Sequence, residues 1–181
     1  RKDDNWNVDR WIKQRNLLYP FAGNSTEIFN CPSDNSYGIN NKGVRVPRLR
    51  SRSINNWVGG PGWGNGGWRV YHKDTDMVDP GPSNTFVMLD EREDSINDGY
   101  FVVDMAGWPT RSQQIVDYPA SYHNNAAGFS FADGHAEIKK WSDPRTTPKI
   151  NKGNMALNVA MYNNKDLYWM MEKSTRKLGR R

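Results

Sequence analysis

Two stretches of alternating large and small residues flank an Asp-Gly pair in the second half of the chain. Residues 129–132 alternate before Asp133-Gly134, and residues 136–141 alternate again after it. An Asp-Gly pair between two such stretches is typical of a β-hairpin, because glycine readily adopts the positive φ of a tight turn. We therefore predict a hairpin with Gly134 at positive φ and with His123 where the chain enters the first strand.

Other short apolar runs predict further strands. Residues 85–89 form the most apolar run of the protein and predict a central strand, and residues 100–104 predict the strand that returns beside it. Residues 27–31 predict a brief strand or extended segment that ends at a turn. Arginines at alternate positions of residues 44–52 favour a strand with a solvated face over a site for phosphate or acidic polysaccharide.

Apolar residues at helical spacing occur near both ends of the chain. At the beginning they predict a helix over about residues 6–18, with Asp4 or Asn5 as N-cap and a face of Trp and Leu in the core. At the end they predict a short helix over about residues 166–174, with Asp166 as N-cap.

The composition limits the class of protein. The 181 residues are 36% apolar and carry a formal charge of +5, and the mean hydropathy is -0.90. We expect one domain over residues 1–172 with a small aromatic core, and a basic, disordered tail over residues 173–181 that accounts for most of the excess charge. No apolar run reaches the roughly 18 to 20 residues that span a bilayer, and Cys31 is the only cysteine. We expect no nucleic-acid partner.

A loop rich in glycine and tryptophan covers residues 57–68, and its glycine content excludes a regular helix or strand. Exposed rings of Trp57, Trp63 and Trp68 could form a surface for a sugar or a partner protein. Buried rings would instead anchor the loop to the domain. Anchoring is slightly favoured, because a long glycine-rich loop is costly to order.

Candidate catalytic residues are few. Histidine and carboxylate side chains that could combine lie near the ends of predicted strands, and they are His123, His135, Asp90, Glu91 and Asp133. A cluster forms if the strands ending at Asp90 and beginning after His123 are neighbours. No Gly-x-Ser-x-Gly, His-Glu-x-x-His or P-loop pattern accompanies them, so a structural role is favoured: His123 hydrogen-bonds locally, to Asp133 or a nearby backbone group, and Asp133 serves the turn.

The loop over residues 90–99 is rich in the oxygen ligands that hard cations prefer. It lacks the spacing and the terminal Glu of an EF-hand. A solvated acidic turn, balanced by Arg92, is the alternative to a metal site.

His123, nine intervening residues and then Asp133-Gly134 resemble the H-x9-D-G processing-associated domain of type II secretion-like pseudopilins, a family of prepilin-type proteins. Other segments resemble the same family in the same order over residues 27–148: Cys31-Pro32-Ser33-Asp34, residues 82–91, residues 95–99, residues 118–123 and Trp141-Ser142-Asp143-Pro144-Arg145.

The resemblance implies an α+β fold: a pilin-like globular head with an antiparallel β-sheet, short flanking helices and long loops. In this family a long apolar N-terminal helix, absent from this sequence, follows a prepilin peptidase site, anchors the protein in the inner membrane and packs along the filament axis. We hypothesise that Cys31 pairs with a cysteine on that helix. Related pseudopilins bind calcium in a loop of the head, which makes calcium the candidate cofactor, at Asp90, Asp94, Asn97 and Asp98.

The expected function is therefore structural and not enzymatic. The chain would be the head of a pseudopilin-like subunit of a type II secretion-like or surface filament in the cell envelope, periplasmic or extracellular, with other filament subunits as partners. The alternative is a secreted carbohydrate-binding module that uses the tryptophan loop. A hydrolase that uses His123 with Asp133 or Asp90 is the least favoured interpretation.

Overall fold

The computed structural model describes residues 6–14, 16–64, 66–151 and 155–179. The chain divides into two compact units, residues 1–52 and residues 53–181, whereas the sequence predicts one domain over residues 1–172. The secondary structure is mixed α+β, dominated by short strands, as expected. None of the helices in the described part of the chain combines the length and the apolar character needed to cross a bilayer.

The first unit consists of short helical turns and a two-stranded hairpin, β1 (Tyr37–Ile39) and β2 (Arg45–Pro47). The predicted N-terminal helix is limited to a single π-helical turn, Asp9–Lys13. Its candidate caps Asp4 and Asn5 lie outside the described residues. The side chain of Asn16 accepts a hydrogen bond from the backbone N–H of Leu18 at 2.9 Å, a local bond that competes with further helix.

The segment predicted as a brief strand is also helical. Residues Glu27–Phe29 form a 3₁₀ turn, and the Ser25 hydroxyl accepts the N–H of Glu27 at 3.2 Å. The small core of this unit contains Ile12, Phe29 and Leu49. A run of apolar residues this short fits a buried turn as well as a strand, so its pattern alone does not separate the two.

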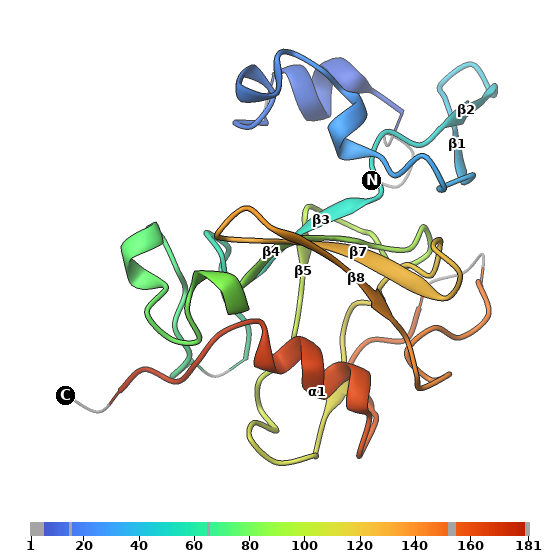
Figure 1. Cartoon of the computed structure of the whole chain (residues 1–181). Helices are drawn as coiled ribbons and strands as arrows, with labels where there is room; N and C mark the ends of the chain where they lie inside the picture. Colours follow the sequence, from blue (N-terminus) through green and yellow to red (C-terminus); the bar gives the residue numbers. More distant parts are fainter. Residues whose placement is uncertain (1–5, 15, 65, 152–154, 180–181) are drawn as a thin grey trace. The chain divides into compact units, whose positions relative to one another are not determined.

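The second unit is built on a five-stranded sheet in the order β5-β3-β4-β7-β8 (Figure 1). Its strands are β3 (Arg52–Asn55), β4 (Phe86–Asp90), β5 (Tyr100–Phe101), β7 (Ala126–Phe131) and β8 (Ala136–Lys140). The central position of β4 and the β7–β8 hairpin confirm the sequence predictions. The predicted returning strand, β5, pairs in parallel with β3 and does not lie beside β4, so the sheet is mixed and not wholly antiparallel.

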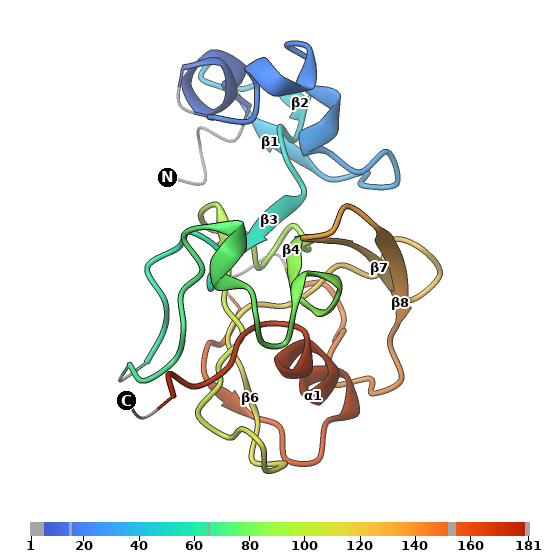
Figure 2. The ribbon, with the colours of Figure 1, turned by 60° about the vertical axis from the view of Figure 1, so that its left-hand side comes forward.

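Helix α1 (Lys165–Glu172) packs against one face of this sheet (Figures 1 and 2). Its Leu167, Met170 and Met171 join Phe86 and Phe129 in the main core. The helix matches the predicted C-terminal helix within two residues, but its N-cap is Asn164 and not Asp166.

The described part of the C-terminal segment, residues 173–179, packs against the second unit. Ser174 and Thr175 are fully buried. The N–H of Arg69 donates to the carbonyl of Arg176, and the N–H of Leu178 donates to the carbonyl of Gly67, both at 2.9 Å. The predicted disordered tail is therefore wrong for these residues, because its backbone pairs with the end of the glycine-rich loop. A second small pair of strands, β6 (Gln114–Ile115) and β9 (Val159–Ala160), completes the unit.

Candidate functional site

Asp133 and Gly134 form the turn between β7 and β8. The N–H of Gly134 donates to the carbonyl of Phe131 at 3.0 Å, so Ala132 and Asp133 are the central residues of the turn. Gly134 follows at a φ of +93°, a conformation that a β-carbon disfavours. The positive φ predicted for Gly134 is confirmed, in a loop of four residues, 132–135, between the two strands.

His135 is the histidine that contacts Asp133. Its Nδ1 lies 2.5 Å from Asp133 Oδ1 and its Nε2 lies 3.3 Å from Glu137 Oε1, while the ring stacks on Phe131 at 4.3 Å. The hydrogen bond to Asp133 raises the pKa of His135, and the same bond lowers the pKa of Asp133. Both side chains are solvent-accessible, and this pair links the residues on either side of Gly134.

His123 lies at the other end of β7, where its Nε2 is 3.4 Å from Oδ2 of the buried Asp90. The expected bond from His123 to Asp133 is therefore wrong. The two residues flank a strand of six residues, which at about 3.3 Å per residue keeps them roughly 20 Å apart. The assumed adjacency of the strands is confirmed, because β4 and β7 are neighbours, and it brings His123 to Asp90.

Asp90 connects three segments at this end of the sheet. Its Oδ2 accepts the N–H of Gly128 at 2.9 Å, and its backbone carbonyl accepts the N–H of Ala120 at 2.9 Å. A β-carbon on Gly128 would lie only 2.9 Å from Asp90 Oδ2. The absence of a side chain at Gly128 therefore lets the Asp90 carboxylate reach the backbone of β7.

The neighbouring Glu91 is buried and also holds backbone in place. The hydroxyl of Ser95 donates to Glu91 Oε1 at 2.8 Å. The oxygen of the same Ser95 hydroxyl accepts the N–H of Tyr118 at 2.8 Å. Glu91 thus connects the loop after β4 to the segment before His123, which is a structural use of the carboxylate.

The candidate calcium ligands do not share one arrangement. Asp94 is held by Arg92 through two contacts, Nε to Oδ1 at 2.5 Å and Nη2 to Oδ2 at 2.9 Å. The same Oδ2 accepts the N–H of Asn151 at 2.7 Å. Asp98 Oδ1 accepts the N–H of Tyr100 at 2.7 Å. Arg92 therefore balances the acidic loop as one of the two interpretations anticipates, but Arg92 and Asp94 form a buried pair and not a solvated turn.

The three loop tryptophans differ in exposure. Trp57 is 1% exposed, and its indole N–H donates to the carbonyl of Val103 at 2.8 Å, so it anchors the loop and offers no surface. Trp68 packs half-buried against the core, with Lys177 Nζ 5.5 Å from its ring. Only Trp63, at 36%, is exposed. The anchoring interpretation holds for Trp57, and a common surface of all three rings is excluded.

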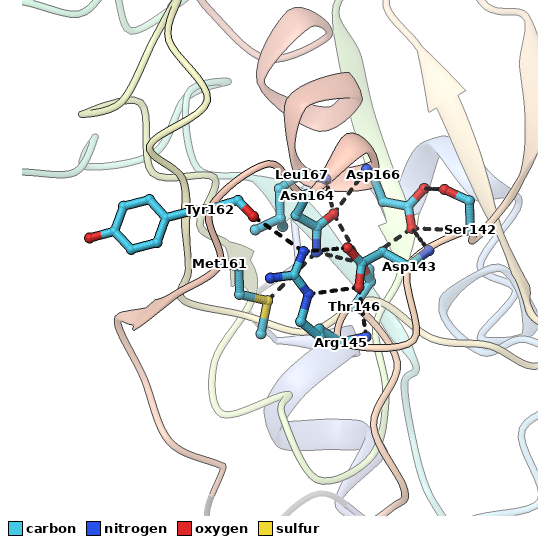
Figure 3. Close-up of polar contacts among 9 residues, drawn as sticks. All are labelled: Ser142, Asp143, Arg145, Thr146, Met161, Tyr162, Asn164, Asp166 and Leu167. Carbon is cyan, nitrogen blue, oxygen red and sulfur yellow. Dashed lines mark hydrogen bonds and ion pairs between the residues drawn. The ribbon is translucent and has the colours of Figure 1, made fainter.

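A buried carboxylate that the sequence predicted only as a helix N-cap organises the loop after β8 (Figure 3). Asp166 in the first turn of α1 is fully buried. It accepts the N–H groups of Ser142 and Asp143 at 2.9 and 2.8 Å and the hydroxyl of Ser142 at 2.9 Å. Lys139 Nζ lies 3.5 Å from its Oδ1.

Asn164 holds the same loop from the other side of the helix start. Its Oδ1 accepts the N–H groups of Asp166 and Leu167 at 2.9 and 3.1 Å, and its Nδ2 donates to Thr146 Oγ1 at 3.0 Å. The Asn-x-Asp spacing before an apolar helix was the available sequence signal. The sequence prediction places Asp166 itself at the N-cap, a position where a carboxylate normally stays accessible to solvent.

A second buried carboxylate, Asp117, lies in the segment between β6 and β7. It is 5% exposed, and its Oδ2 accepts the N–H of Val102 at 2.7 Å. Burial raises the pKa of Asp117 to about 7; the negative charge of Asp98 adds to this and the Val102 hydrogen bond opposes it. The adjacent cavity, of about 10 Å³, has room for about one water molecule.

Comparison with known proteins adds no relative: no family model, no curated protein and no solved structure matches this chain. The function must therefore be argued from the geometry. His123 and Asp90 form the one histidine–carboxylate pair at the end of the β4–β7 strands that the described residues show. Neither residue lines the cavity beside Asp117 or the open depression between Ser142 and Lys165.

Proposed function

We propose that this chain is a non-enzymatic structural subunit, the head of a pseudopilin-like protein of a type II secretion-like or surface filament. The residues that resemble the family motif support this proposal by what they contact. Asp133 and Gly134 form a turn, and Asp90 and Trp141 bond to backbone groups of Gly128 and Ala120. Motif residues that hold backbone in place fit a scaffold.

The observation that carries the proposal is the contrast between the two faces of the sheet. Phe86, Leu89, Phe129 and Phe131 are buried on the α1 side. The other face presents small and aliphatic residues that are partly covered or exposed, Met88, Gly128, Ser130, Ala136 and Ile138, with the charged Asp90 and Lys140 at one end. A sheet face of this kind suits the packing of a long apolar helix, which pilin-like heads require.

The proposal places the head in the cell envelope, on the periplasmic or extracellular side, with other filament subunits as partners. Membrane attachment would be supplied by an N-terminal helix outside this sequence. Cys31 is buried, and its pairing with a cysteine on that helix remains part of the proposal; a thiol that titrates fully in the mature protein would refute the pairing.

The proposal includes calcium binding only if the Arg92–Asp94 pair can open. Binding in the loop over residues 90–99 requires Asp94 to leave Arg92. A bound ion would raise the Tm in millimolar calcium by linkage, and an unchanged Tm would remove calcium from the proposal.

The direct test is to purify the mature protein from its native cells, determine its N-terminus by mass spectrometry and find its location by fractionation. The expected result is a processed end that begins an apolar helix of about 20 residues and recovery in the membrane or a sheared filament fraction. A mature N-terminus without such a helix, or recovery only as a free monomer, would overturn the proposal.

A carbohydrate-binding module remains the second candidate, supported by Trp63 and Trp68 alone. Titration with neutral and acidic polysaccharides, monitored by Trp fluorescence, tests it. Quenching that is lost in Trp63→Ala would favour this candidate, and an unchanged signal would count against it.

A further inference from the structure

Strand β8 forms an edge of the five-stranded sheet, and among the described residues it pairs with β7 alone. The N–H of Phe131 donates to His135, and the N–H of Trp141 donates to Asn125. In an antiparallel pair the inward and outward backbone groups alternate, so Glu137 and Lys139 direct their backbone toward β7. The N–H and C=O groups of Ala136, Ile138 and Lys140 consequently point away from the sheet.

The side chains along this edge are open to solvent. Ala136, Glu137 and Lys140 are exposed, and Ile138 is 65% exposed although it is aliphatic. An edge with free backbone groups is a template for another strand, and natural proteins usually block it with charges. Strand β8 carries one Glu and two Lys, and the positions of these charges along the strand favour one pairing partner over others.

We propose that β8 pairs antiparallel with β8 of a second copy of this chain, about a twofold axis at Ile138. In this register Ile138 faces Ile138 of the other copy, and Ala136 faces Lys140. These are the residues whose backbone groups point outward, so they can exchange hydrogen bonds. Glu137 then lies opposite Lys139 of the second copy, and Lys139 lies opposite Glu137.

The charge pairing is specific to this register. Glu137 and Lys139 occupy the non-hydrogen-bonded positions of the new pair, where opposed side chains approach most closely. A shift by two residues in one direction opposes Glu137 to Glu137, and a shift in the other direction opposes Lys139 to Lys139. Both alternatives bring like charges together, which destabilises cross-strand pairs. The same charges that disfavour other strands therefore favour self-pairing about Ile138.

Lys139 is already ordered for this role. Its Nζ lies 3.5 Å from Asp166 and 5.4 Å from the ring of Trp169, which limits the entropy lost when a second carboxylate arrives. The contact is self-complementary, as a twofold interface requires. It is also small, so the dimer should be weak and concentration-dependent.

Cysteine cross-linking tests the register. Residues opposed in a hydrogen-bonded antiparallel pair have Cα atoms about 5.5 Å apart, within the range of a disulfide. Ile138→Cys should therefore give a disulfide-linked dimer under mild oxidation. Ala136→Cys is the matched control, because its symmetry mate lies four residues away along the strand, roughly 13 Å. The parent protein, whose only cysteine is Cys31, is the control for any disulfide that forms through Cys31.

Charge reversal tests the partner. Glu137→Lys places lysine opposite Lys139 twice in the dimer and should weaken association in sedimentation velocity by about tenfold. Glu27→Lys, at another exposed position, controls for the change in net charge. Thermal unfolding of each variant confirms that it folds. Lys139→Glu is unsuitable, because it would place a carboxylate beside the buried Asp166.

Cross-linking at residue 138 with little at residue 136, together with weaker association of Glu137→Lys than of Glu27→Lys, supports the proposal. Equal cross-linking at both positions, or a monomer at every concentration with no disulfide at residue 138, overturns it. These measurements use the purified chain and do not depend on filament assembly, so they fail or succeed separately from the proposed function.

Discussion

The carboxylate of Asp166 accepts two hydrogen bonds from Ser142, one from its backbone N–H and one from its hydroxyl, each 2.9 Å long. The two residues lie 24 positions apart in the sequence, and the contact attaches the first turn of α1 to the loop that leaves β8. Because α1 covers the main core, this part-buried contact helps to position the helix over the sheet.

Asp166→Ala should destabilise the second unit by about 1–3 kcal/mol, since it removes the buried carboxylate that accepts the part-buried N–H groups of Ser142 and Asp143. Urea unfolding monitored by Trp fluorescence measures the loss. Arg145→Ala is the control, because it breaks an accessible ion pair with Asp143 in the same loop. A loss for Asp166→Ala no larger than that for Arg145→Ala would contradict the assigned role.

Asp117 should make stability depend on pH. Its pKa is about 7 in the folded protein and ordinarily 3.8, so the folded state holds a proton that the unfolded state has released. Stability from this group is full below pH 4 and falls as the pH rises to about 7, by up to about 1.4 kcal/mol per pH unit.

Asp117→Asn removes this titration and keeps an acceptor for the N–H of Val102. The variant should gain stability relative to the parent between pH 5 and pH 8, as measured by denaturant unfolding at both values. A difference between variant and parent that is the same at the two pH values would show that Asp117 does not titrate in this window.

The Asp133–His135 pair should be visible by NMR. The hydrogen bond to Asp133 raises the pKa of His135, so the imidazole should titrate above its ordinary value of 6.5. Asp133→Asn should lower that pKa toward the ordinary value. A pKa of His135 that does not change in Asp133→Asn would show that the contact is absent in solution.

Gly134→Val should cost about 1–2 kcal/mol, because a side chain at a φ of +93° strains the backbone. Space is not the cause, since a β-carbon at Gly134 meets nothing within 4 Å. Gly38→Val in β1 is the control: its β-carbon is equally free, and its φ lies outside the positive region. Thermal unfolding should show a clear loss for Gly134 and a small one for Gly38.

The tests also separate the interpretations of the histidines. His123→Ala should affect folding less than Gly134→Val does, since Asp90, the partner of His123, also accepts the backbone N–H of Gly128 and keeps that bond in the variant. A variant that folds normally but loses a measurable hydrolytic activity would restore the enzyme interpretation.

Local patterns determined the elements whose causes are local. The Asp133-Gly134 turn and the β7–β8 hairpin follow from turn chemistry and alternation, β4 follows from its apolar run, and α1 follows from apolar spacing. The predicted helix over residues 6–18 was shorter in the structure, because a nearby asparagine offers the backbone a competing hydrogen bond.

Pairings between distant residues were decided by the tertiary structure alone. The sequence contained His123, Asp133 and Asp90, but only the position of β4 beside β7 assigns His123 to Asp90 and leaves Asp133 to His135. The same holds for Asp94, which bonds to Arg92 and to the backbone of Asn151, and for Asp166, which is buried under the loop after β8. From the sequence alone, every carboxylate is expected to be a polar surface residue. Its burial, its pKa and its partner depend on which strands and loops the fold brings around it.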